Sequence, residues 1–442
     1  MKVLFVDAAD VYLGRRPASN KVAPLIGMAY VATYVRAQGQ DVRVYDLMTG
    51  QRMGSSLGQA LAEFSPEVVG LTSTTPFIPA TYHAAQTVRQ VLPDTSIILG
   101  GPHATILPID CFEECPEIDY IIVGEGEQSF AELVQSLSTG GNGRDMPGVM
   151  KRGEPLGNLR KRPLMDNLDE LPFPDWSFYH YAAYDQVYSY RLGRMENLFQ
   201  VLLSRGCPYQ CSFCYNIFGA SYRTRSAANV RSEMESAFNR FDARFFDFVD
   251  PTLTIEKPRF LKLCQELGDS LMAGEIAWSF ETRVDQVSEE LLNRARLAGC
   301  ESILFGIESG SQAILDTMGK GITIEQAWEA LDAAARANLH IKVTLIIGHP
   351  YETRKTLDET LDFMRKARAT YNVEFMPAFL GIYPGTRTYE MVENGEGGTR
   401  WVDGVRHNWQ RARRDRPMIE IGELNTAVLV DYMTELKSII GE

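Results

Sequence analysis

The chain has 442 residues, which is too long for one ordinary domain, so we expect two or three. Its 45% apolar and 23% charged residues are typical of a globular protein and exclude wholesale disorder. The formal charge of −13 opposes nonspecific binding to nucleic acid and to anionic membranes, so we expect neither as a partner.

The N-terminal segment MKVLFVDAADVYLG is interrupted by Asp7 and Asp10, which predicts a first core strand and not a secretory signal. No uncharged apolar run approaches the roughly 18 residues that a membrane span needs. Seven cysteines without a signal peptide do not indicate a disulfide framework. We therefore expect a cytoplasmic protein.

The first 140 residues alternate short apolar runs with helix-length segments. This alternation predicts an α/β domain with a doubly wound, Rossmann-like parallel sheet over residues 1–145. Ligands of such sheets dock at the carboxyl ends of the strands, but no GxGxxG follows the first run, so a dinucleotide fingerprint is absent. The expected strands are residues 2–8, 41–47, 67–73, 96–101 and 120–126, with a helix over 25–38.

Residues 146–195 are expected to be a linker. The glycines at 140–143 and the prolines of the segment 168–176 break the periodicity and favour extended or turn backbone.

A second series of apolar runs and helical segments follows. It predicts a partial (β/α)6 barrel over residues 196–390, with its chemistry on the loops after the strands. Residues 391–442 are expected to be a short C-terminal segment with one helix over 426–440. The expected barrel strands are 197–204, 244–250, 275–282, 302–308, 340–348 and 373–382, with helices over 227–240 and 323–337.

Three of the seven cysteines lie within eight residues, directly after the first barrel strand. Cys207, Cys211 and Cys214 have the spacing C-x3-C-x2-C. Soft thiolates suit a 4Fe–4S cluster, and the lack of a fourth nearby cysteine leaves one iron open for another ligand. The alternatives are a zinc site, which lacks a fourth ligand because the nearest histidines are His180 and His340, or three unrelated thiols.

This motif, with the aromatic Phe213 before the third cysteine, resembles that of the radical S-adenosylmethionine (radical SAM) superfamily. The resemblance implies that the three cysteines ligate the cluster and that SAM chelates the open iron. It implies reductive cleavage of SAM to methionine and a 5′-deoxyadenosyl radical that abstracts hydrogen, with electrons from a donor such as flavodoxin or ferredoxin. Phe213 would lie against the adenine.

Further stretches match the same superfamily. Residues 306–311 resemble its GxESGS element, which implies that Glu308 and Ser309 lie near the ribose or methionine of SAM. The alternative is a helix N-cap formed by Ser309 or Ser311. Residues 348–353 resemble its GxPxET element, which implies that backbone at Gly348 meets the adenine, and the alternative is an ordinary turn.

Two positions at strand ends leave alternatives open. Arg283 could pair with the SAM carboxylate through charge-assisted hydrogen bonds, or it could form a surface salt bridge. The family's GGE-like element is not recognisable after the second strand, where Asp250-Pro-Thr252 stands instead. Contacts to the SAM amino group are therefore unassigned.

The N-terminal half resembles the cobalamin-binding domain that precedes the barrel in one radical SAM subgroup. The D-x-H-x-x-G run that supplies an axial histidine is absent, so the resemblance makes cobalamin a possible cofactor. We expect His103 to be structural and not a cobalt ligand. The matching segments are 25–32, 72–75, 100–105 and 123–127.

The expected function is radical chemistry on a small molecule, and the competing class is a non-enzymatic cobalamin or cluster carrier. The short C-terminal segment and the acidic charge favour dehydration of a vicinal diol on a cationic amino sugar, as in radical SAM diol dehydratases of antibiotic biosynthesis. The alternative is a cobalamin-dependent methyltransferase. Dehydration needs an acid and a base. The candidates are Asp250, Glu281, Glu352 and Tyr383, the last placed on the final strand.

The tract from Arg406 to Arg416 carries five arginines. It could bind phosphate or nucleic acid, but the acidic balance favours an ordinary solvated segment.

Overall fold

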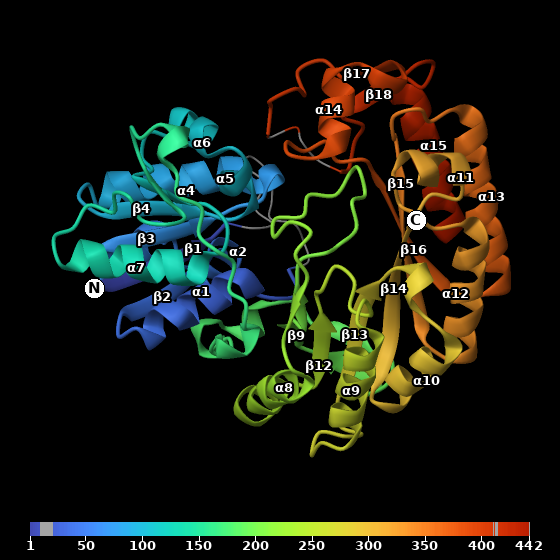
Figure 1. Cartoon of the computed structure of the whole chain (residues 1–442), viewed down its shortest axis with the longest axis horizontal. Coiled ribbons are helices and arrows are strands. Elements are labelled where there is room, and N and C mark those ends of the chain that lie inside the picture. Colours follow the sequence, from blue (N-terminus) through green and yellow to red (C-terminus); the bar gives the residue numbers. More distant parts are fainter. Residues whose placement is uncertain (9–20, 410, 412–413, 442) are drawn as a thin grey trace. The chain divides into compact units, whose positions relative to one another are not determined.

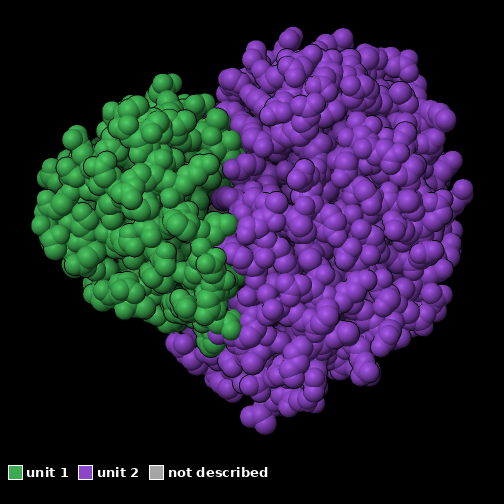
Figure 2. All heavy atoms as spheres, in the orientation of Figure 1, with its two compact units in different colours: residues 1–187 green, residues 188–442 purple. Residues whose placement is uncertain are grey.

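The structure is a computed structural model that describes residues 1–8, 21–409, 411 and 414–441. Figure 1 follows the chain through its helices and strands. The chain divides into two compact units, residues 1–187 and residues 188–442, which Figure 2 colours separately. No helix among the described residues is both long enough and apolar enough to cross a membrane.

The first unit is built on a six-stranded sheet in the order β2-β1-β3-β4-β5-β6 (Figure 1). Strands β1 to β5 are parallel, whereas β6 is antiparallel to β5. The order 2-1-3-4-5 is that of a doubly wound sheet, so this prediction is confirmed. The strands are β1 (Lys2–Asp7), β2 (Asp41–Asp46), β3 (Val68–Thr72), β4 (Ser96–Gly100), β5 (Tyr120–Ile122) and β6 (Val149–Lys151).

Helices cover this sheet as two packed pairs, α1 with α7 and α3 with α4. Under α1 and α7, the rings of Phe5 and Phe130 lie 4.7 Å apart. A Cβ at Gly70 would come within 2.7 Å of the Phe5 ring and 2.9 Å of Phe130, so only glycine leaves room for this aromatic pair. The helices are α1 (Ile26–Ala37), α2 (Leu47–Arg52), α3 (Leu57–Phe64), α4 (Ile78–Val91), α5 (Pro102–Ile106), α6 (Pro108–Glu114) and α7 (Gly126–Ser138).

The expected linker over 146–195 needs correction, because most of it belongs to the first unit. Its start forms β6, and the boundary between the units falls at residue 187. The proline-rich stretch is held by polar contacts. The Asp175 amide donates to Thr33 Oγ1 at 2.9 Å, its carboxylate pairs with Arg36, and the Tyr184 hydroxyl donates to Asp46 at 2.7 Å.

The second unit contains a six-stranded, entirely parallel sheet in the order β16-β15-β14-β13-β12-β9 (Figure 1). Within the described chain β9 and β16 are its edges, so the barrel is open and the predicted partial barrel is confirmed. Its strands are β9 (Leu198–Val201), β12 (Phe245–Phe248), β13 (Ala277–Thr282), β14 (Cys300–Glu308), β15 (His340–Ile347) and β16 (Val373–Phe379).

Helices pack around the outside of this sheet, and aromatic rings fill the space beneath them. Trp278 and Phe280 of β13 contact Phe260 of α9, with ring centroids 6.2 and 5.3 Å apart. The helices are α8 (Ala227–Phe241), α9 (Lys257–Gly268), α10 (Glu289–Leu297), α11 (Gln312–Thr317), α12 (Ile324–Arg336) and α13 (Arg354–Thr370).

Beyond the barrel, the C-terminal segment contains more structure than the sequence predicts. The expected helix is present as α15 (Thr426–Ile440), packed on β16 and α13. A further helix and a two-stranded sheet precede it, namely α14 (Arg387–Glu393), β17 (Thr399–Trp401) and β18 (Ile419–Ile421). Two short hairpins also lie in this unit, β7 (Val187–Ser189) with β8 (Arg194–Glu196), and β10 (Ser204–Arg205) with β11 (Arg223–Thr224).

Candidate cluster and cofactor site

The three clustered cysteines lie on the loop that leaves β10. Gly206 opens this loop with a φ of +89°, and a Cβ there would lie 1.8 Å from the carbonyl oxygen of Ser221. The turn into Cys207 therefore requires glycine. Cys207, Cys211 and Cys214 are all free thiols, and the Cys214 amide donates to the Cys211 carbonyl at 3.0 Å.

The thiols influence one another electrostatically. Cys214 is exposed in part, but protein surrounds most of its thiol. Its pKa is raised to about 11, mainly by this desolvation and further by the charges of Cys211 and Cys207. Among the described residues, no three His, Cys, Asp or Glu side chains converge tightly enough for a single metal ion. Each thiolate of a 4Fe–4S cluster binds a different iron, so three free thiols on one loop fit a cluster with one iron left open.

A network of hydrogen bonds to Ser212 holds the cysteine loop in place. The Ser212 amide donates to the Met318 carbonyl at 2.7 Å, and the Thr388 amide donates to the Ser212 carbonyl at 2.8 Å. His349 Nδ1 donates to the Pro350 carbonyl at 3.0 Å, so Nε2 accepts from the Ser212 hydroxyl at 3.1 Å. Burial lowers the pKa of His349 to about 4, which keeps the ring neutral in this role.

Glu308 ends β14 as a buried carboxylate with a φ of +76°, a conformation uncommon for residues other than glycine. Its Oε1 accepts from Lys320 Nζ at 2.9 Å, and its Oε2 accepts from Thr344 Oγ1 at 3.0 Å. Burial alone would lower the pKa of Lys320, but the Glu308 charge overrides it and the pKa is raised. The ammonium also lies 5.7 Å from the centre of the Phe213 ring. The structure thus links two residues expected at the SAM site.

Arg283 follows β13 and is buried, so it does not form the surface salt bridge that the sequence left open. Its Nε and Nη2 bind Asp285 at 2.9 and 3.0 Å, and its guanidinium stacks 3.7 Å from the centre of the Tyr209 ring. Nη1 is buried and has no hydrogen-bond partner. A buried donor of this kind suits a ligand carboxylate.

The turn after β15 is closed by Glu352. Its Oε2 accepts from the amides of Gly348 at 2.5 Å and His349 at 3.2 Å, while Oε1 is buried without a partner. Burial raises the pKa of this carboxyl to about 7. Gly348 has a φ of +90°, and a Cβ there would meet nothing within 4 Å, so open space lies beside this backbone.

Comparison with known proteins agrees with this arrangement. A model of the B12 binding domain matches residues 19–134, and a model of the radical SAM superfamily matches residues 201–364. The uncharacterized methyltransferase PH0819 of Pyrococcus horikoshii is 32% identical over 396 residues, which cover 88% of this chain and 83% of that protein. This chain belongs to the radical SAM superfamily.

Two further comparisons extend to most of this radical SAM protein. The anaerobic magnesium-protoporphyrin IX monomethyl ester cyclase of Rubrivivax gelatinosus is 31% identical over 83% of this chain and 66% of the cyclase. The structure of TsrM from Kitasatospora setae, with cobalamin and a [4Fe-4S] cluster bound, aligns over 99% of this chain and 90% of its own at a TM-score of 0.77. At 19% identity, this likeness shows a shared fold.

The family matches therefore confirm both halves of the resemblance. The radical SAM domain takes a [4Fe-4S] cluster and SAM, and the B12 binding domain takes cobalamin. In the B12 binding domain, His103 is fully buried, and its Nδ1 lies 3.0 Å from Thr75 Oγ1. Burial lowers the pKa of His103 to about 4. This hydrogen bond inside the protein supports the structural role expected for this histidine.

The proposed acid and base residues of the radical SAM domain occupy different environments. Asp250 is fully buried and accepts from the Leu203 amide at 3.0 Å and from the Ser204 amide and hydroxyl at 2.5 Å, while burial raises its pKa to about 6. It therefore anchors the start of the cysteine loop. Glu281 is only partly buried, so it keeps some contact with solvent. Desolvation and then the Glu308 charge raise its pKa to about 7.

Two other expectations need adjustment. Tyr383 follows β16, which ends at Phe379, so it is not on the final strand as predicted. Ser309 is fully buried, with its Oγ 3.2 Å from Thr360 Oγ1 and accepting from the Ser311 amide at 3.1 Å. Ser309 thus satisfies an amide before α11, in partial agreement with the capping alternative, whereas the Ser311 side chain makes no cap bond.

The described part of the arginine tract is largely engaged by contacts within the second unit. Arg406 pairs with Glu393 at 2.6 Å, Arg411 donates to the Asp403 carbonyl at 3.1 Å, and the Arg414 carbonyl accepts from the Phe379 amide. Arg413 lies outside the described residues.

Lys320, His349 and Thr388 contact residues of the candidate site but are not predicted from the sequence. Each is brought to the site by the folding of the chain, and no sequence motif indicates its hydrogen-bond partner.

Proposed function

We propose that this radical SAM enzyme transfers a methyl group from SAM to a carbon of a small molecule, with cobalamin as the intermediate carrier. The supporting observation is the 32% identity to a protein named as a methyltransferase, over 88% of this chain and across both domains. None of the relatives described above is named as a dehydratase. Methyl transfer, the alternative reading of the sequence, therefore has more support than dehydration.

Several residues of the second unit have the chemistry to hold SAM. When bound, the cluster supplies the electron that cleaves SAM, and cobalamin supplies a methyl carrier. The Glu308 carboxylate, held by Lys320, is suited to accept hydrogen bonds from the ribose hydroxyls. The unpartnered Nη1 of Arg283 is suited to donate to the SAM carboxylate, and the open backbone at Gly348 leaves space for the adenine.

The substrate is proposed to be a small neutral or cationic molecule. The partly exposed Glu281 at the end of β13 has a pKa of about 7, so near neutral pH it can accept a proton or bind a cationic group. Burial and the Glu308 charge raise this pKa, while the Lys320 and Arg414 cations lower it.

The products of SAM distinguish the candidate reactions. Methyl donation from SAM leaves S-adenosylhomocysteine, whereas reductive cleavage of a second SAM leaves methionine and 5′-deoxyadenosine, which carries the hydrogen removed from the substrate carbon. The reconstituted enzyme with SAM and dithionite should therefore form about one equivalent of S-adenosylhomocysteine per bound cobalamin even without substrate, and none when cobalamin is omitted.

Formation of 5′-deoxyadenosine alone, with cobalamin bound, would contradict methyl transfer and favour dehydration or cyclisation. A protein that turned over SAM in neither way would be a carrier and not an enzyme. The product mass with a trial substrate then separates the outcomes, since methylation adds a methylene and dehydration removes a water.

A further inference from the structure

A pocket lined by charged, amide, aromatic and aliphatic side chains lies at the end of the barrel opposite the cysteine loop. Its volume is about 380 Å³, within the range of small-molecule sites. It opens where β14 and β15 begin, whereas the cluster and SAM residues follow the strand ends. The eight-residue strand β15 separates the two ends by roughly 25 Å. The pocket residues are Tyr190, Arg191, Arg296, Glu301, Ala335, Asn338, Leu339, His340, Ile341 and Asn372.

Two guanidinium groups of this pocket lack carboxylate partners among the described residues. Arg191 Nε is buried and has no hydrogen-bond partner. Arg296 makes one long hydrogen bond, from Nη1 to the Cys300 carbonyl at 3.4 Å. Nearby Arg336 of α12, in contrast, pairs with Glu289 at 2.8 Å. Two such groups in a chain of net charge −13 indicate a local site for an anion.

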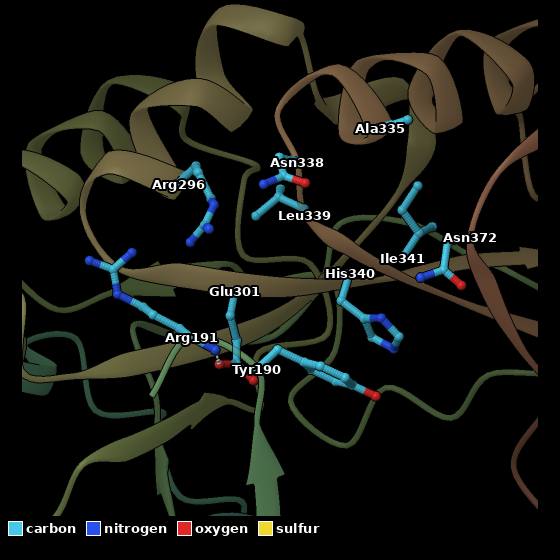
Figure 3. A pocket seen from close by; sticks show the side chains of 10 residues that line it. All are labelled: Tyr190, Arg191, Arg296, Glu301, Ala335, Asn338, Leu339, His340, Ile341 and Asn372. Atoms are coloured by element: carbon cyan, nitrogen blue, oxygen red, sulfur yellow. Dashed lines mark hydrogen bonds between the residues drawn. The ribbon is translucent and has the colours of Figure 1, made fainter. Parts of the chain in front are cut away.

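Glu301, the single acidic residue among those lining the pocket, accepts hydrogen bonds from the neighbouring hairpin. Glu301 is buried, and its Oε2 accepts from the Ser189 hydroxyl at 2.6 Å. The same oxygen accepts from the Arg191 amide at 3.0 Å (Figure 3). These bonds fasten the hairpin of β7 and β8 to the start of β14. Glu301 thereby positions Arg191 at the pocket.

Aromatic and amide groups form the other side. Figure 3 shows Arg191 and Arg296 toward one end and the rings of Tyr190 and His340 toward the other. These rings stack with centroids 4.6 Å apart and planes 26° apart, and Tyr190 remains 60% exposed. His340 Nε2 lies 3.0 Å from Glu374, which holds the stacked pair in place. The platform suits a planar ring, and the exposed amide of Asn372 lies beside it.

We infer that this pocket binds a nucleoside monophosphate, with the phosphate at Arg191 and Arg296 and the base on Tyr190. The guanidiniums can hold phosphate oxygens through paired hydrogen bonds, and the unpartnered Nε of Arg191 gains an acceptor. The site is separate from the SAM site and does not depend on the proposed reaction.

The test is calorimetric titration of the full-length holoenzyme with 5′-AMP, inorganic phosphate and adenosine, each with S-adenosylhomocysteine at saturation to fill the SAM site. AMP should bind more tightly than either fragment. Arg191→Gln and Arg296→Gln should each raise the Kd of AMP at least about tenfold, since each removes charge-assisted hydrogen bonds, without changing adenosine binding. Tyr190→Ala should weaken AMP and adenosine but not phosphate. Arg336→Gln is the matched control and should change nothing.

Several results would overturn the inference. They are no AMP binding, AMP binding that S-adenosylhomocysteine displaces, and AMP binding insensitive to both pocket arginines. Equal binding of phosphate and AMP that Tyr190→Ala leaves unchanged would also overturn it, because the pocket would then take free phosphate and not a nucleotide. Because Tyr190 is exposed and Arg191 and Arg296 are only half-buried, these variants should fold, and circular dichroism and cluster absorbance check this.

Discussion

At the scale of single residues, Glu308 combines burial, an unusual backbone conformation and a cationic partner. Strained conformations of this kind persist where the surroundings enforce them, and they cluster at functional sites. The hydrogen bonds from Lys320 and Thr344 fix both carboxylate oxygens. Its position at the end of β14, beside the Lys320 that also faces Phe213, gives structural support to the proposal that Glu308 contacts SAM.

Glu308→Gln keeps the size of this side chain and removes its charge. We expect the Kd of SAM to rise at least about tenfold while the iron content stays unchanged, because a charge-assisted hydrogen bond is lost. Calorimetry on the anaerobic, cluster-loaded protein measures this. The control is Glu235→Gln on α8, which removes a surface partner of Arg231. Unchanged SAM affinity would refute the assignment of Glu308.

Glu352 predicts a pH dependence of stability. Burial raises its pKa from about 4.5 to about 7, so the folded state favours the protonated form. The protonated Glu352 carboxyl contributes fully to the free energy of unfolding below pH 4.5. This contribution is lost as the pH rises through 7 and the carboxyl ionises in the folded state. The loss is on the order of 3 kcal/mol, from about 1.4 kcal/mol per pKa unit.

Glu352→Gln retains an acceptor for the two turn amides but cannot ionise. The free energy of unfolding of the variant minus that of the parent protein should therefore be larger at pH 8 than at pH 5. Urea unfolding at both pH values checks this, with the exposed Glu290→Gln on α10 as control. A difference between Glu352→Gln and parent that stays constant with pH would contradict the predicted titration.

At the scale of elements, the cysteine loop depends on its first turn. Gly206→Ala places a Cβ 1.8 Å from a backbone carbonyl at φ +89°, so the loop must distort. Iron content and absorbance at the cluster band should fall by more than half. The matched control is Gly219→Ala, which has a φ of +67° but open space around its Cβ, and should keep the cluster. Equal cluster content in both variants would show that the turn tolerates a side chain.

Long apolar runs made the main elements predictable. The six barrel strands and α15 follow from continuous apolar or amphipathic patterns, since burial selects the residues directly. Strand β6 was missed because only two apolar residues, Val149 and Met150, stand between Gly148 and the charged Lys151.

The candidate site was predictable only where its residues lie in one motif. Cys207, Cys211 and Cys214 share a loop, so their spacing alone indicates a cluster. The contacts between Lys320 and Glu308 and between His349 and Ser212 join residues 12 and 137 positions apart. Such pairings arise from the packing of strands and turns, which one sequence does not display.

At the scale of the whole molecule, the chain combines two compact units with different cofactors. We expect each cofactor to protect the strand ends of its own unit from hydrogen exchange, because a ligand that binds only the folded state stabilises the segments it contacts. Cobalamin should slow exchange after β3 and β4, and SAM should slow exchange after β9, β14 and β15. Mass spectrometry of the full-length holoenzyme, with each ligand added separately, measures this. Identical protection patterns for the two ligands would contradict separate sites.

The contact of Thr388 with Ser212 also sets where the second unit can be shortened. Thr388 lies on α14, beyond the last barrel strand, yet its amide and hydroxyl bind the residue directly after the second cysteine. A fragment that ends at β16, the last barrel strand, would therefore lack the Thr388 hydrogen bonds that hold the cysteine loop. A fragment of this unit that keeps the cysteine loop supported must extend through α14.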